Sequence, residues 1–131
     1  MEFVSRPLGE WMKAMKARMA VEGGSPETAR EIYIRLYEQS RDQKIREMAR
    51  RRLLQLDSAK EVENINKVLN AFRSRTGTCI NSWAEVAPAF RAAGLPMDAT
   101  GTPLDPTNMP YRLLVDGCSV ELAPQSEIPR H

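Results

Sequence analysis

The chain has 131 residues, of which 42% are hydrophobic and 27% are charged, the composition of an ordinary globular domain. Its net charge of +2 is divided as +4 over residues 1–60 and −2 over residues 61–131, a bias too weak to indicate a nucleic-acid partner by itself. No apolar run approaches the ~18 residues of a membrane span, and the first residues lack the layout of a signal peptide.

The first part of the chain shows four helical patterns separated by short breaks. They comprise residues 8–22, a second helix running to about Gln39, a third capped by Asp42, and residues 59–76 after Ser58. Gly23-Gly24 ends the first helix, and Ser25 and Pro26 take the N-cap and first helical positions of the second. Gly77 ends the fourth. Because the connections are short, we expect these helices to pack as antiparallel neighbours.

Residues 10–43 resemble one 34-residue tetratricopeptide repeat. The positions that match the pattern of the family are Ala17, Gly24, Ala29, Tyr33 and Leu36. The positions that depart from it are Lys13, Lys16 and Arg41. The resemblance implies a helical-hairpin scaffold, and such repeats normally stack in threes or more, so this segment is expected to be the end of a longer solenoid.

The segment 94–122 is rich in turn residues and ends in a predicted β-hairpin over residues 111–122. Asp116-Gly117 separates two apolar runs and favours a two-residue type I′ turn. The apolar face would carry the pairs Tyr111–Leu122, Leu113–Val120 and Val115–Cys118, and the other face Arg112–Glu121 and Leu114–Ser119. Because an isolated hairpin is marginal in water, the apolar face is expected to lie on the fourth helix, against Val68, Leu69 and Phe72.

Two short helical segments are predicted between the fourth helix and the hairpin. Ser82 and Glu85 have the spacing of a capping box. Pro88 breaks that segment or starts another, which Gly94 closes. Trp83 and Phe90 are expected to fill the space between the fourth helix and the hairpin.

The same region resembles a reduced headgroup of the major pseudopilin of type II secretion and of related pilins. In that family a helix ends in a glycine turn, and an Asp-Pro turn with a Pro-Tyr end leads into strands. Phe72 to Gly77 and Asp105-Pro106-Thr107-Asn108-Met109-Pro110-Tyr111 stand in those places. Asn108, which tolerates a left-handed backbone, replaces the glycine of the second motif. With the helical repeat, the resemblance implies a repeat protein of a bacterial cell envelope. Assembly into a pilus is not implied, because the sequence lacks the apolar N-terminal helix of pilins.

Few residues offer catalytic or metal-binding chemistry. His131 is the one histidine, at the last position, so a serine or cysteine nucleophile has no base to work with. Asp98, Asp105 and Asp116 adjoin Pro, Gly or Ala in turns and are interpreted as turn residues. We therefore expect no enzyme activity, no cofactor and no metal site.

Arg46, Arg50 and Arg51 form a basic stretch on the third helix. Successive helical residues point about 100° apart, and no aromatic residue is interleaved for base stacking, so a solvated helix face is the favoured interpretation. Binding of nucleic acid or another anionic surface by Arg46–Arg52 is the alternative.

Trp11, Met12, Met15 and Met19 supply the large apolar side chains of the first helix. Packing on the second helix, or on a missing upstream repeat, is the favoured interpretation. A partner-binding stripe is the alternative, because methionine-rich surfaces adapt to partners.

Cys79 and Cys118 are predicted to form a disulfide, since both lie at the ends of elements that the expected packing brings together. Two buried thiols are the alternative. A disulfide indicates an oxidising compartment such as the periplasm or the cell surface, which would require a targeting segment outside this chain.

These patterns predict a mainly α fold of antiparallel, tetratricopeptide-like helical hairpins with a small C-terminal α+β cap that ends in a two-stranded hairpin. Residues 1–57 form the helical segment and residues 58–131 the long helix and cap. The predicted function is a non-catalytic scaffold or protein-interaction module of a bacterial cell-envelope assembly. Its partners would be proteins, with no nucleic acid and no membrane span in this chain.

Overall fold

The structure, a computed structural model, describes residues 2–129, with the side chains of residues 9–20 and 23–129. The fold is mainly helical with a two-stranded antiparallel hairpin near the C-terminus, as the sequence predicts. It divides into two compact units, Met1–Leu56 and Asp57–His131. The sequence predicts a boundary one residue later, between residues 57 and 58. Among the described residues, none of the helices is both long and apolar enough to cross a membrane. His131 lies outside the described residues.

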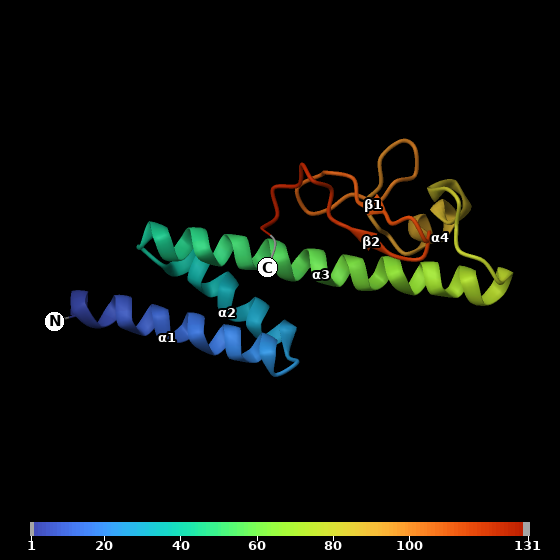
Figure 1. Cartoon of the computed structure of the whole chain (residues 1–131). Coiled ribbons are helices and arrows are strands. Elements are labelled where there is room, and N and C mark those ends of the chain that lie inside the picture. The colour runs from blue at the N-terminus through green and yellow to red at the C-terminus, as the bar shows by residue number, and fades with distance from the viewer. Residues whose placement is uncertain (1, 130–131) are drawn as a thin grey trace. The chain divides into compact units, whose positions relative to one another are not determined.

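The first unit contains α1 (Glu2–Glu22), α2 (Pro26–Gln39) and the first part of α3 (Gln43–Thr76). Figure 1 shows α1 and α2 as an antiparallel pair. Gly24, with a φ of +84°, reverses the chain between them. The core of this unit is made of Ala14, Ala17, Ala29, Tyr33, Leu36, Ile45 and Ala49. Small side chains on α1 therefore allow α2 to approach it closely.

The third and fourth predicted helices are one helix, α3, so the predicted break at Ser58 is wrong. No Gly or Pro lies between Gln43 and Thr76 to interrupt it. Ser58 is buried, and its hydroxyl hydrogen-bonds the hydroxyl of Tyr111 at 2.9 Å instead of capping a helix. The start of α3 is as predicted, because the carboxylate of Asp42 accepts the backbone N–H of Lys44 at 2.9 Å.

The second unit packs its short elements on the later turns of α3 (Figure 1). These elements are a 3₁₀ helix (η1, Trp83–Glu85), α4 (Ala87–Ala92), β1 (Arg112–Leu113) and β2 (Val120–Glu121). The buried core is Ile65, Leu69, Ile80, Val86, Phe90, Tyr111 and Val120. Trp83 lies against Phe90 with ring centroids 5.8 Å apart, which confirms the predicted filling of this space. The capping box also forms, because the Glu85 carboxylate accepts the backbone N–H of Ser82 at 2.9 Å.

The hairpin has the predicted register but not the predicted turn. Leu113 pairs with Val120 and Arg112 with Glu121, as expected. A two-residue turn would be closed by hydrogen bonds between Val115 and Cys118. The closing bond instead runs from the N–H of Leu114 to the carbonyl of Ser119 at 2.9 Å, so the loop is longer than two residues. Gly117 has a φ of +72° but Asp116 has no positive φ, whereas a type I′ turn requires both.

Val115 and Cys118 consequently belong to the loop and do not form a pair on the apolar face. Val115 is fully exposed, which corrects its predicted position against the helix. The loop instead binds the segment after α3, since the N–H of Ile80 donates to the carbonyl of Gly117 at 3.2 Å. A local turn rule does not include this tertiary contact.

Candidate functional site

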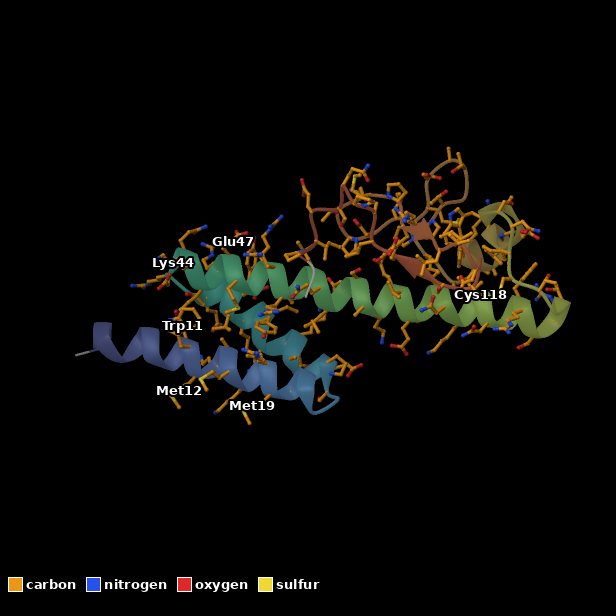
Figure 2. The ribbon with its side chains drawn as sticks, viewed as in Figure 1. Trp11, Met12, Met19, Lys44, Glu47 and Cys118 are labelled. Atoms are coloured by element: carbon orange, nitrogen blue, oxygen red, sulfur yellow. A yellow bond between two sulfur atoms is a disulfide. The ribbon has the colours of Figure 1, made fainter. Side chains whose placement is uncertain are left out.

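An exposed apolar stripe on α1 is the strongest candidate site. Trp11 is 47% exposed, and Met12, Met15 and Met19 are 59%, 63% and 66% exposed. Figure 2 shows Met12 and Met19 projecting from the side of α1 that faces away from α2. These four residues are called the methionine stripe below. Their exposure does not agree with the expected packing on the second helix, whereas packing on an upstream repeat stays a prediction.

The methionine stripe faces outward because of the alanines on the opposite side of α1. Ala14 and Ala17 are 9% and 0% exposed and belong to the core shared with α2. Positions 12, 15 and 19 follow the i, i+3, i+7 spacing of one helix face, about 180° from that core. The structure therefore leaves the larger side chains on the open face of α1 and the smaller ones at the helix contact.

Charge on this part of α1 is of one sign. Lys16 is exposed next to Met12 and Met19, Lys13 is exposed further round the same flank, and residues 11–20 contain no carboxylate. Glu10 points to another partner, because its carboxylate accepts the hydroxyl of Ser40 at 2.8 Å. The methionine stripe is thus an apolar surface with a basic border.

The other exposed large apolar residues among the described side chains are isolated. Tyr37 has the guanidinium of Arg46 over its ring, 5.5 Å from the centroid. Val115 stands alone on the hairpin loop. Among the side chains that the structure describes, α1 is therefore the one element with several such residues close together.

The basic stretch on α3 is exposed but partly engaged. Arg46 stacks on Tyr37, and Arg50 lies 3.5 Å from the carboxylate of Glu47. Figure 2 shows Glu47 and Lys44 on the same end of α3. Arg51 is exposed. The carboxylate beside Arg50 and the stacking of Arg46 on Tyr37 reduce the positive charge that this surface presents to an anion.

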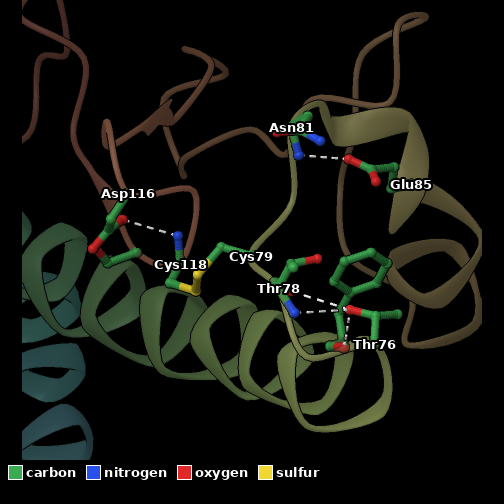
Figure 3. The surroundings of a disulfide bond; sticks show 9 residues. Thr76, Thr78, Cys79, Asn81, Glu85, Asp116 and Cys118 are labelled. Carbon is green, nitrogen blue, oxygen red and sulfur yellow. Dashed lines mark hydrogen bonds between the residues drawn. A yellow bond between two sulfur atoms is a disulfide. The ribbon is translucent and has the colours of Figure 1, made fainter.

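Cys79 and Cys118 form a disulfide, as predicted, with their Cα atoms 5.2 Å apart (Figure 3). The N–H of Cys118 donates to the carboxylate of Asp116 at 2.9 Å. The disulfide thus joins the segment after α3 to the hairpin loop, at the place where Ile80 and Gly117 are hydrogen-bonded. Within the described residues, no group of three or more His, Cys, Asp or Glu side chains is arranged to hold a metal ion.

A polar cluster under the hairpin was missed by the sequence analysis. The hydroxyl of Tyr111 donates to the carboxylate of Glu61 at 3.0 Å and accepts from Ser58 at 2.9 Å. Burial raises the pKa of Glu61, and it raises the pKa of Tyr111. The signal was available, because a buried tyrosine needs a partner for its hydroxyl. The cluster anchors the hairpin on α3 and contains no nucleophile beside a base.

Two loops with the same hydrogen-bond pattern precede the hairpin. In each, an aspartate accepts the N–H and the hydroxyl of the threonine two residues on, and the N–H four residues on; the aspartates are Asp98 and Asp105. Antiparallel bridges close the loops, Met97 with Pro103 and Leu104 with Pro110. Position four of each loop has a positive φ, at Gly101 and Asn108, which confirms the left-handed backbone expected at Asn108. Both aspartates are therefore turn residues, as the sequence indicates.

Asp105→Asn is expected to lower the free energy of unfolding at pH 7 by about 1–3 kcal/mol, because Asp105 is buried and holds charge-assisted hydrogen bonds. Burial alone would raise the pKa of Asp105, but hydrogen bonds from Ser126 and Thr107 outweigh it and lower the pKa. A lowered pKa stabilises the fold above the ordinary carboxyl range, and this contribution is lost as the pH falls through the folded-state pKa.

Urea unfolding from pH 7 to pH 2 measures this dependence. The gap between the wild type and Asp105→Asn should shrink in acid. Asp98→Asn is the matched control, since Asp98 has the same loop contacts but is exposed, and its effect should be smaller. An Asp105→Asn effect that equals the Asp98→Asn effect, or that is independent of pH, would contradict this assignment.

No protein-family model, curated protein or solved structure matches the chain. The resemblances to the tetratricopeptide repeat and to the pseudopilin headgroup therefore enter the proposed function as hypotheses.

Proposed function

We propose that this chain is a non-catalytic protein-interaction module of a bacterial cell-envelope assembly, and that the methionine stripe on α1 is its docking surface. The single observation that carries the proposal is the exposure of Met12, Met15 and Met19 on one helix face, with half-exposed Trp11 at its edge. Contiguous exposed apolar surface rimmed by charge is typical of protein contact sites.

The residue types favour a protein partner. Methionine has a flexible, polarizable side chain that adapts to the shape of a partner, and tryptophan is enriched among residues that dominate binding energy. Burying the exposed parts of four such side chains contributes about 4–7 kcal/mol, of which association entropy removes a large share. The methionine stripe alone therefore supports modest affinity, as suits one contact within a larger assembly.

The resemblance to a helical repeat supports the same proposal. Repeat hairpins pack on neighbouring hairpins through apolar helix faces, and α1 presents such a face with no cover in the first unit. The disulfide supports a location in the periplasm or at the cell surface, because disulfides persist in oxidising compartments.

Photocrosslinking in the cells that make this protein tests the proposal. A photoreactive amino acid at Met15 is expected to give a discrete adduct with an envelope protein. The same amino acid at Glu38, exposed on α2, is the matched control and should give none. The adduct should weaken at least tenfold when Met12 and Met19 are both replaced by Gln. Equal labelling from the two positions, or adducts only with nucleic acid, would contradict the proposal.

The alternative function is binding of nucleic acid or another anionic surface through Arg46, Arg50 and Arg51, which are exposed on α3. We expect Arg50→Gln and Arg51→Gln each to change stability by no more than about 0.5 kcal/mol, as exposed substitutions do. Titration of the wild type with DNA and RNA at low and high salt should show no tight binding. Tight binding that falls steeply with salt and is lost in the double variant would favour the alternative.

A further inference from the structure

We infer that the partner segment that docks on the methionine stripe is an amphipathic helix with acidic residues beside its apolar face. This inference rests on the proposed function and deepens it, because it specifies the chemistry of the partner. Two features of α1 carry it: the helical spacing of the exposed methionines and the single sign of the charge at their border.

The shape of the surface indicates a helix. Met12, Met15 and Met19 lie at i, i+3 and i+7 on one side of a regular helix, 59–66% exposed. From Trp11 to Met19 the methionine stripe is about 12 Å long, slightly more than two helical turns. An amphipathic helix whose own apolar residues recur at that spacing can lie along it and bury several side chains at once.

The charge indicates acidic residues on that helix. Lys16 lies one turn from both Met12 and Met19, Lys13 lies further round the same flank of α1, and no carboxylate occurs in residues 11–20. Glu10, the nearest acid before them, is hydrogen-bonded to Ser40 on the side of α2. A partner with carboxylates at the border that meets this flank would find complementary charge there, which raises association rate and selects against basic partners.

The same charge disfavours one other occupant. A second copy of α1 docked on the first would bring lysines against lysines, a repulsive arrangement. A membrane-surface helix buries a broad apolar face between basic residues. The methionine stripe has four exposed apolar residues, so vesicles that contain anionic lipid form the competing arm of the test.

Titration calorimetry with designed peptides on the full oxidised chain tests the inference. The acidic peptide has about 18 residues, with leucines at i, i+3, i+7 spacing and glutamates at the border positions, and the basic peptide replaces every glutamate by lysine. We expect the wild type to bind the acidic peptide at least tenfold more tightly than the basic one, with affinity that falls as salt rises.

A charge reversal provides the sharpest control. The variant Lys13→Glu with Lys16→Glu should reverse the preference and favour the basic peptide. The variant Lys44→Glu with Arg51→Glu carries the same net charge change on α3 and should keep the wild-type preference. Both pairs are exposed, and circular dichroism confirms that each variant is folded.

Several outcomes would overturn the inference. They are equal or absent binding of the two peptides, tighter binding to vesicles that contain anionic lipid, and self-association of the chain at the concentrations used. Its failure is distinguishable from failure of the proposed function. An adduct from Met15 with a protein whose contact segment is not an acidic helix overturns only the inference, whereas no adduct from Met15 overturns the proposed function.

Discussion

Removal of the Cys79–Cys118 disulfide is expected to lower the free energy of unfolding of the unit Asp57–His131 by about 4 kcal/mol. The two cysteines are 39 residues apart, and a crosslink of that span restricts the unfolded chain by about that amount in the chain-entropy model. The loop encloses η1, α4, both aspartate loops and β1. A unit with a small hydrophobic core depends heavily on such a restraint.

Urea unfolding of the oxidised wild type and of the double variant Cys79→Ser, Cys118→Ser measures the loss. The wild type treated with a reductant should approach the double variant, because both lack the crosslink, while the double variant itself should not respond to the reductant. Thiol titration of denatured, non-reduced protein should find no thiol. Two thiols per chain, or identical unfolding with and without reductant, would contradict the prediction and the inferred location.

The substitution Gly117→Val is expected to lower the free energy of unfolding by about 2–5 kcal/mol, the sum of backbone strain and of crowding against Ile80. Gly117 has a φ of +72°, a backbone conformation that a β-branched residue adopts only with strain of about 1–2 kcal/mol. A Cβ atom at this position would also collide with the backbone carbonyl oxygen of Ile80, so the hydrogen bond from Ile80 to Gly117 and the hairpin loop would have to shift. Chemical denaturation of the oxidised protein measures the cost.

Gly94→Val separates the two reasons. Gly94 has a φ of +73°, nearly that of Gly117, but a Cβ atom there would meet nothing within 4 Å. This variant should therefore cost only the backbone strain, about 1–2 kcal/mol. If the two variants are equally destabilised, the close contact between Gly117 and Ile80 does not exist as described.

Local sequence rules predicted the elements but not the contacts that modify them. The register of Leu113 with Val120 follows from the alternation of apolar residues, which the pleat requires. The loop type does not follow from the alternation, and the loop also contacts Ile80, far away in sequence, through a hydrogen bond that local rules do not include. Similarly, the local sequence predicts a helix cap at Ser58, but its hydroxyl binds that of Tyr111, which lies 53 residues later.

Local sequence rules also could not determine whether the candidate site is exposed. The spacing of Met12, Met15 and Met19 placed them on one helix face, but it did not tell whether that face was inside or outside. The buried side of α1 is the one with Ala14 and Ala17, whose small side chains let α2 approach there. The disulfide was predictable, because Cys79 and Cys118 lie at the ends of elements that the hairpin and α3 bring together.

Methionine oxidation tests most directly whether the methionine stripe is covered by a partner. In the purified chain, hydrogen peroxide should oxidise Met12, Met15 and Met19 faster than the partly buried Met48, Met97 and Met109, which serve as internal references. In intact cells, mass spectrometry should find the three exposed methionines protected relative to the same references. Oxidation of Met12, Met15 and Met19 in cells at the relative rate seen in the purified chain would contradict the account.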